Sequence, residues 1–279
     1  MILTGTGTIQ SEFLPPLLDA FPTAAGAYSL RKLRTAYTGA AVRVRRSSDN
    51  AELDIGFDAN GDFDTASLQS FIGVSNGRIR TWYDQSGNNR NFGNTVTTTQ
   101  PVIADTGVIN TYNNRPMISF ANYGLIGATQ FFTSADMYAS CVLKSNSTAS
   151  QRGLMTSRAA GTDNSPAMTL ANGNAPSIAQ AAGGCGAFSD SNQMTFSAQW
   201  DSAVASYLWK NSVLQSGPCN NPAYTNTSAQ TVMGANRQGD AYTLQAYVFE
   251  MVLWHSLQAD NRASTSIEAN QAKYYSIGT

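Results

Sequence analysis

The chain has 279 residues, of which 42% are hydrophobic and 13% charged, with a net charge of -1. The charged share is about half of what globular proteins usually carry, so the surface must be neutral and polar. Such a surface attracts neither nucleic acid nor a membrane, and no apolar run approaches the roughly 18 residues that cross a bilayer. The length suits a single large β-sandwich domain.

The start of the chain has no basic flank and apolar stretch of a signal peptide. The three cysteines, Cys141, Cys185 and Cys219, are widely spaced and odd in number. We therefore predict reduced thiols, neither a disulfide framework nor a metal site, and no cofactor.

Residues 1–22 contain TGTGT and the pair Pro15-Pro16, and they show no sustained hydrophobic period. Proline resists both helix interiors and central strands. We predict an N-terminal arm or linker over residues 1–22, which adds little to the core and anchors the chain to a neighbouring subunit, and one domain over residues 23–279.

The first elements of this domain follow from hydrophobic periods. Leu30, Leu33 and Tyr37 share a helical face in AYSLRKLRTAYTG, which predicts a short helix, and Val42 and Val44 alternate with arginines in AAVRVRR, which predicts a strand. A second helix is expected in TASLQSFIG, capped by Asp64 or Thr65. Further strands are expected in GRIRTWYDQ, NRPMISF and DMYASCVLK.

Residues 145–191 are rich in small polar residues, which predicts long surface loops with weak strands at GLMTS and PAMTL. The last third predicts strands in QMTFSAQW, ASYLWK, SVLQSG, AQTVMGA and LQAYVFEMVLWH, with a hairpin connection at Lys210, Asn211 and Ser212. A closing helix should point Ile267 and Tyr274 inward. The predicted fold class is all-β: a two-sheet antiparallel sandwich with a few short helices and a C-terminal helix.

Two segments resemble known families. Residues Ala27 to Phe92, through AYSLRKLRTAYTGAAVRVRRSSDN and WYDQSGNNRNF, resemble the catalytic domain of family 54 α-L-arabinofuranosidases. The segment from VMGANRQGDAY to NQAKYY is similar to the last strand and helix of concanavalin-like and laminin-G-like sandwiches. The resemblance implies a jelly roll, a fold that serves glycosidases, lectins and virion proteins alike.

A hydrolase of this family needs two carboxylates that flank the scissile bond. Where the resemblance places the nucleophilic Glu, this chain reads AMTLANGNAP, without an acid. The second carboxylate of the family falls in MGANRQGDAY, where Asp240 is displaced. On these grounds we expect no catalytic residues and no release of arabinose.

Glu250 lies in AYVFEMVLW and shares a predicted strand face with Val248, Val252 and Trp254. It is either a desolvated acid with a raised pKa or a structural acid paired with an Arg or the backbone, and we favour the latter. His255 ends the same strand without an evident partner for catalysis or metal binding.

Two charged clusters have alternative interpretations. Asp58, Asn60, Asp62 and Asp64 offer oxygen ligands for calcium, but turn formation and helix capping explain them better. The basic cluster is either an anion-binding or subunit-contact patch or, as we favour, a solvated face balanced by acids; it comprises Arg31, Lys32, Arg34, Arg43, Arg45 and Arg46.

Trp82, Tyr83 and Asp84 are the candidate ligand-binding residues. Sugar rings stack on aromatic side chains, and a carboxylate can bind hydroxyl groups. The alternative is structural: one aromatic ring faces the core and Asp84 caps the turn that follows.

These observations lead to a main hypothesis and two alternatives. The main one is a non-enzymatic virion protein of a tailed phage, a capsid decoration, fibre or tail receptor-binding component, made in the host cytoplasm. Its expected partners are other virion subunits, copies of itself in a homo-oligomer and a cell-surface glycan. The alternatives are a glycoside hydrolase of the α-L-arabinofuranosidase type and a free lectin-like module.

Overall fold

The computed structural model describes most of the chain. The described residues are 15–127, 136–145, 152–157, 167–171, 175–179, 193–200, 206–219, 230–235, 244–256, 258 and 266–278.

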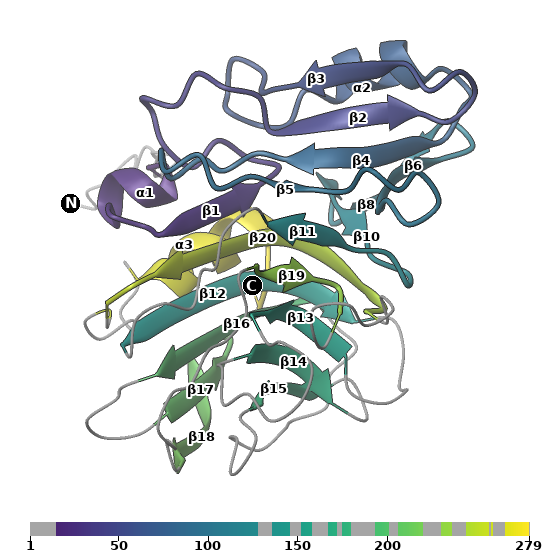
Figure 1. The fold of residues 1–279 in the computed structure, drawn as a ribbon. Coiled ribbons are helices and arrows are strands. Elements are labelled where there is room, and N and C mark those ends of the chain that lie inside the picture. The colour runs from purple at the N-terminus through teal and green to yellow at the C-terminus, as the bar shows by residue number, and fades with distance from the viewer. Residues whose placement is uncertain are drawn as a thin grey trace, which may run out of the picture.

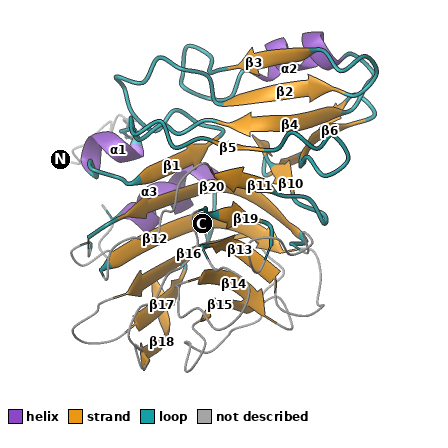
Figure 2. Ribbon diagram, in the orientation of Figure 1, coloured by secondary structure: helices purple, strands orange, loops and turns teal. Residues whose placement is uncertain are grey.

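Strands dominate the described residues, and three short helices accompany them (Figures 1 and 2). The helices are α1 (Leu17–Ala20), α2 (Thr65–Ile72) and α3 (Ile267–Tyr275). The strands of the first half are β1 (Gly26–Ser29), β2 (Val42–Arg46), β3 (Glu52–Ile55), β4 (Gly77–Trp82), β5 (Phe92–Gly93), β6 (Val102–Asp105), β7 (Val108–Ile109), β8 (Thr111–Tyr112), β9 (Arg115–Pro116), β10 (Ile118–Ser119) and β11 (Leu125–Gly127). Those of the second half are β12 (Met137–Ser145), β13 (Arg152–Thr156), β14 (Ala167–Ala171), β15 (Ala175–Ala179), β16 (Gln193–Trp200), β17 (Ser206–Lys210), β18 (Val213–Cys219), β19 (Val232–Met233) and β20 (Ala246–Trp254).

Two antiparallel layers diverge from β4. One edge of β4 pairs with β2, which pairs with β3, and the other edge pairs with β6 at its start and with β5 at its end. From β6 the first layer continues through β10, β20, β12, β16, β17 and β18, with β1 beside β10 on β20. From β5 the second layer continues through β11, β19, β13, β14 and β15. The predicted two-layer sandwich is thereby confirmed.

The main core lies between the two layers. It contains Met251 and Leu253 of β20 from the first layer and Met155 and Met233 from the second. The outer face of the first layer is also covered, because α3 packs on β12 and β16 and buries Ile267 and Tyr275. Both faces of β20 are therefore removed from water, which accounts for its long apolar run.

Many predicted elements are confirmed. The described strands include β2, β4, β12, β16 and β20, and Asp64 caps α2 by accepting a hydrogen bond from the Ser67 N–H at 2.9 Å. The β17–β18 hairpin turns through Asn211 and Ser212, both with positive φ, as a type I′ connection requires. In α3 the fully buried tyrosine is Tyr275, whereas the predicted Tyr274 is only partly buried.

The predicted helix at residues 27–39 is wrong. Residues Gly26–Ser29 instead form β1, which pairs with residues 250–253 of β20. The chain after β1 turns away, with Leu33 buried at the outer face of β20. The long edge of β20 offers backbone hydrogen bonds that a short amphipathic helix cannot match, so tertiary pairing overrides the helical period.

The described end of the predicted arm belongs to the domain. Helix α1 buries Leu17 and Leu18 completely, in a cluster with Leu33, Trp254 and Ile267. These two leucines therefore contribute to the core, contrary to the expectation for residues 1–22. Residues 1–14 lie outside the described part, so the arm itself and the division at residue 22 stay predictions.

The cysteines differ from the prediction of three thiols. Cys141 is a free, buried thiol in β12, whereas Cys219 at the end of β18 is disulfide-bonded. Cys185 lies outside the described residues. Spacing in the sequence does not determine which cysteines form a disulfide, because the folded chain decides which of them meet.

Within the described part of the chain, no helix is long and apolar enough to cross a membrane.

Candidate functional site

The three predicted ligand-binding residues end β4 and begin the loop that follows it. Trp82 is fully buried and packs edge-on against Tyr28 in the core, so its faces are not open to a sugar in this conformation. Tyr83 points to the opposite, outer face and donates a hydrogen bond to Asp54 Oδ1 at 2.8 Å. Burial, followed by this hydrogen bond, raises the pKa of Tyr83 to about 12.

Asp84 is only 4% exposed and organises the loop. Its Oδ1 accepts hydrogen bonds from the N–H groups of Ala27 and Ser86, both at 2.9 Å, and its Oδ2 accepts from the Ser86 hydroxyl and the Arg90 N–H. Four donors leave this carboxylate little capacity for a ligand. Of the three predicted residues, Tyr83 is therefore the one whose side chain reaches the surface; ligand binding by the three stays a prediction.

Gln85, which sequence reasoning missed, joins this loop to the rest of the molecule. Its carbonyl oxygen accepts from the Leu33 N–H at 2.8 Å, and its amide donates to the carbonyls of Ser29 and Arg31 at 3.0 Å each. The side chain thus satisfies backbone groups that a helix at residues 27–39 would have satisfied itself. The sequence signal for this role was the position of Gln85 in WYDQSGNN, close to the end of a strand.

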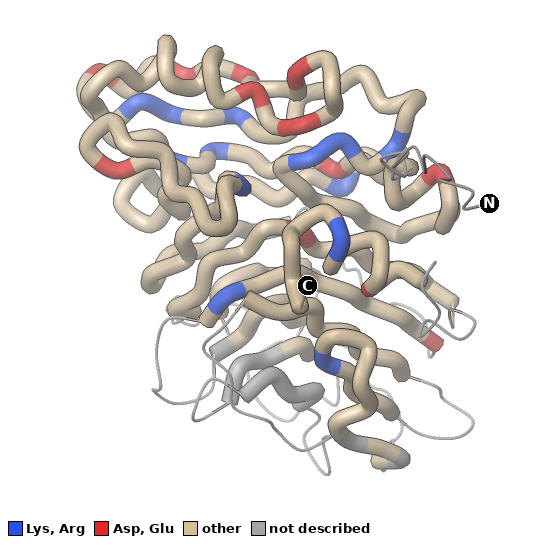
Figure 3. Tube along the Cα trace, turned by 180° about the vertical axis from the view of Figure 1, so that it is seen from behind, with Lys and Arg blue, Asp and Glu red and all other residues tan. Residues whose placement is uncertain are grey.

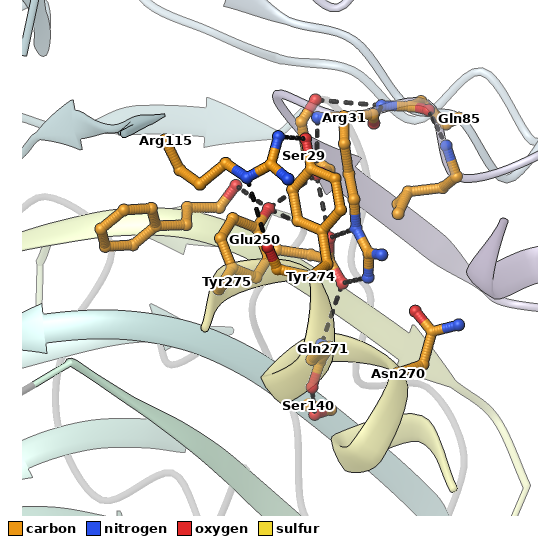
Figure 4. A network of polar contacts seen from close by, with 12 residues as sticks. Ser29, Arg31, Gln85, Arg115, Ser140, Glu250, Asn270, Gln271, Tyr274 and Tyr275 are labelled. Atoms are coloured by element: carbon orange, nitrogen blue, oxygen red, sulfur yellow. Dashed lines mark hydrogen bonds and ion pairs between the residues drawn. The ribbon is translucent and has the colours of Figure 1, made fainter. Parts of the chain in front are cut away.

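Glu250 forms a buried ion pair with Arg31 (Figure 4). Arg31 Nε lies 2.7 Å from Oε2 and Nη2 lies 2.9 Å from Oε1, which is a bidentate geometry. Oε2 also accepts from Ser29 and Tyr275, and Oε1 accepts from the Gln271 amide at 3.1 Å. Burial alone would lower the pKa of Arg31, but the Glu250 carboxylate raises it above its usual value.

The predicted structural role of Glu250 is therefore confirmed, with Arg31 as its partner. Its predicted face needs one correction, because a register shift against β12 puts Val248 on the inner side while Glu250 and Val252 face α3. A β-bulge of this kind adds one residue to a strand and reverses the alternation beyond it.

The buried polar network extends along α3 in both directions (Figure 4). On one side, Gln271 accepts from the Ser140 hydroxyl of β12 at 2.6 Å. On the other side, the guanidinium groups of Arg31 and Arg115 lie 4.5 and 3.9 Å from the centre of the Tyr274 ring. Cation–π attraction between these groups and the ring stabilises the position of Tyr274. Because the network joins β1, β12, β20 and α3, it stabilises the docking of the helix.

Glu268 in the first turn of α3 is a second buried acid, 1% exposed. Its Oε1 accepts a long hydrogen bond from Tyr138 at 3.4 Å, while its Oε2 has no hydrogen-bond partner among the described residues. Burial raises the pKa of this carboxyl group above its usual value. The folded environment thus favours the protonated form more than the unfolded chain does.

This shift predicts a pH-dependent difference between wild type and Glu268→Gln. The folded pKa exceeds the unfolded value near 4.5, so the folded state binds the proton more tightly. The contribution of Glu268 to stability is greatest below pH 4.5 and is lost as pH rises through the folded pKa. Chemical denaturation from pH 4 to 8 should show the variant gaining stability relative to wild type with rising pH. A constant difference across that range would contradict the prediction.

The acidic stretch and the basic cluster make both local and long-range contacts. Asp58 Oδ1 accepts from the N–H groups of Asn60 and Asp62, so with the cap at Asp64 the predicted turn and capping roles are confirmed. Basic and acidic residues are interspersed over the β2, β3 and β4 region (Figure 3). Arg43 pairs with Asp54 at 2.8 Å in a solvated, balanced pair, as predicted. Arg31 and Arg45 are buried instead, so the prediction of a solvated face is wrong for these two members of the basic cluster.

Three acidic side chains are buried in the described part of the chain: Asp84, Glu250 and Glu268. Each is enclosed by protein, so none of them meets a soluble substrate in this conformation. Among the described residues, no group of His, Cys, Asp and Glu side chains has the arrangement to hold a metal ion. His255 follows β20 and is partly buried.

Comparisons with solved structures show that this fold is similar to that of two arabinofuranosidases. The structure of a family 54 α-L-arabinofuranosidase soaked with a cyclic sulfate inhibitor matches with a TM-score of 0.65 and 17% identity, over 90% of this chain and 63% of that one. An arabinofuranosidase complexed with arabinofuranosyl-α-1,2-xylobiose matches with a TM-score of 0.66 and 18% identity, over 91% of this chain and 63% of that one. At this identity the likeness shows the fold, and the chain spans less than two thirds of these proteins.

The sequence itself carries a more specific match. The family model described as "Alpha-L-arabinofuranosidase B, catalytic" matches residues 19–128, the part that runs from α1 to β11. No curated protein matches the chain by sequence.

These findings contradict the main hypothesis of a non-enzymatic phage protein. The family model and both structures belong to arabinofuranosidases, and they favour the hydrolase alternative over a capsid decoration, fibre or tail component. The hypothesis was wrong because the lack of an acid in AMTLANGNAP does not exclude catalysis: the two carboxylates that flank a scissile bond can come from any segments that the fold brings together. The expected homo-oligomer, the glycan partner and the location of the protein stay untested.

Proposed function

We propose that this chain is a glycoside hydrolase of the α-L-arabinofuranosidase type. The observation that carries the proposal is the match of the arabinofuranosidase catalytic model to residues 19–128. The fold supports it, because the similarity to arabinofuranosidase structures extends over about 90% of the chain, well beyond the matched segment.

The chemistry requires two carboxyl groups, one that protonates the leaving oxygen and one that acts as a nucleophile or activates water. Asp84, Glu250 and Glu268 are enclosed, so the pair must come from elsewhere. The aspartates in the segments between the strands of the second half are the candidates: Asp163, Asp190, Asp201 and Asp240, all outside the described residues. Asp240 is the first choice, because it lies in the stretch that resembles the family's second acid site.

The described part of the chain has a supporting role in this mechanism. The Asp84 loop, the Gln85 side chain and the Glu250 network hold β1, β4, β12 and β20 together with α3. Catalytic groups must be held within a fraction of an ångström of their working geometry, and a framework of hydrogen-bonded strands provides the rigidity that this requires.

The test is product release from 4-nitrophenyl α-L-arabinofuranoside and from an arabinose-substituted xylan. We expect 4-nitrophenol from the first and free arabinose from the second. NMR of the first-formed sugar would show whether the anomeric configuration is retained or inverted. A folded protein that releases neither product from any arabinofuranoside would refute the proposal.

A further inference from the structure

A groove with a mixed polar and apolar lining lies on the outer side of the sheet where β4, β5 and β11 meet. Its volume is about 450 Å³, within the range of small-molecule sites. The strand register places it opposite the core, because Ile126 is 40% exposed while its neighbours Leu125 and Gly127 are buried. The groove is separate from the buried networks around Asp84 and Glu250.

The lining of the groove suits a neutral sugar. It presents amide and hydroxyl side chains, one guanidinium group and two exposed aliphatic side chains, and no carboxylate among the described lining residues. Those that carry the argument are Arg80, Thr81, Asn91, Val96 and Ile126. Sugars combine hydroxyl groups with apolar C–H faces, so a mixture of uncharged polar groups and aliphatic side chains complements them without an electrostatic requirement.

The wall formed by residues 94–99 is rigid. Asn94 is 4% exposed, its amide donates to the carbonyls of Thr99 and Gly124, and its carbonyl oxygen accepts from the Val96 N–H at 2.8 Å. The side-chain amide of Gln100 donates a hydrogen bond to the backbone carbonyl of Asn94 at 2.7 Å. A wall that is ordered before binding costs a ligand less entropy than a loop that must first fold around it.

Gly93, one of the lining residues, gives an independent indication that the groove is kept open. Its backbone does not have the positive φ that favours glycine, and an added Cβ would meet no atom closer than 3.4 Å. The nearest atoms belong to Arg80 and Thr81, both part of the groove, so a side chain here would enter it. Gly127 differs, because a Cβ there would lie 3.0 Å from Phe92. The fold requires a small residue at 127, whereas at 93 glycine keeps the groove open.

We propose that this groove binds the neutral backbone of a pentose polysaccharide and acts as an additional subsite for the polymeric substrate. The choice of ligand rests on the proposed function, while the groove itself rests on its geometry. Arg80 also lies 3.6 Å from Glu52, which holds its guanidinium at the groove wall.

The experiment uses the whole chain with Gly93→Leu, which fills the groove. Gly56→Leu is the matched control, because an added Cβ at Gly56 would meet nothing within 4 Å. Retardation in native gels that contain arabinoxylan measures polymer binding, and thermal melting checks the fold. We expect Gly93→Leu to weaken binding by about tenfold or more, a loss of about 1.4 kcal/mol, with an unchanged melting temperature. Gly56→Leu should bind like wild type.

A second variant keeps the test valid if Gly93→Leu misfolds. If Gly93→Leu melts at a lower temperature than wild type, Ile126→Ser removes an exposed aliphatic contact without adding volume and should weaken binding several-fold.

Equal retardation of wild type and the groove variants, or no retardation of wild type by arabinoxylan, overturns the proposal. Activity on 4-nitrophenyl α-L-arabinofuranoside separates the two proposals, because this small substrate does not need the groove. Polymer binding without hydrolysis would support the proposed groove and refute the proposed hydrolase activity.

Discussion

Replacing Arg31 by Met is expected to lower the free energy of unfolding by about 3–5 kcal/mol, because it leaves the Glu250 carboxylate buried without its cation. The side chain of Glu250 is completely enclosed and that of Arg31 is 5% exposed. The remaining donors, Ser29, Tyr275 and Gln271, are neutral and cannot replace the bidentate guanidinium. Urea denaturation at pH 7 measures the loss.

The matched control is Arg43→Met. Arg43 makes an equally short ion pair with Asp54, but their side chains are 43% and 42% exposed. Exposed pairs contribute no more than about 1 kcal/mol, so this variant should unfold almost like wild type. The double variant Arg31→Met, Glu250→Leu should recover part of the loss, because it removes the unpaired charge. Equal effects of the two single variants would show that burial does not govern this pair.

Asp240→Asn is expected to lower kcat on 4-nitrophenyl α-L-arabinofuranoside by about 10²–10⁴-fold, the usual contribution of a general acid or base. The amide is nearly isosteric with the carboxylate but transfers no proton at neutral pH, so the melting temperature should stay within about 2 °C of wild type. Steady-state kinetics with a saturating substrate, together with thermal melting, measures both quantities.

Two comparisons make this result specific. Asp105→Asn changes an exposed aspartate at the end of β6 and should leave kcat unchanged. Glu250→Gln should reduce stability, and activity only through that loss. Full activity of Asp240→Asn would move the acid/base role to Asp163, Asp190 or Asp201, each of which the same assay can test.

The sequence alone was enough to find the family resemblance, but it predicted only part of the candidate site. WYDQSGNNRNF indicated a functional loop, but its residues turned out to have different roles. Trp82 fills the core, Asp84 holds the loop by four hydrogen bonds, and Tyr83 alone of the predicted three reaches the surface. The groove around Gly93 combines residues from β4, β5 and β11, which no local pattern connects.

The sequence by itself determined the elements that local forces suffice to specify. The alternation in β2, the capped helix α2 and the Asn211-Ser212 turn follow from side-chain period, an Asp cap and tolerance of positive φ. Only the tertiary structure decided that residues 26–29 form a strand, because the free edge of β20 and the amide of Gln85 satisfy their backbone. It also decided the partner of Glu250 and the bulge that turns it toward α3, since both depend on contacts between residues more than a hundred positions apart.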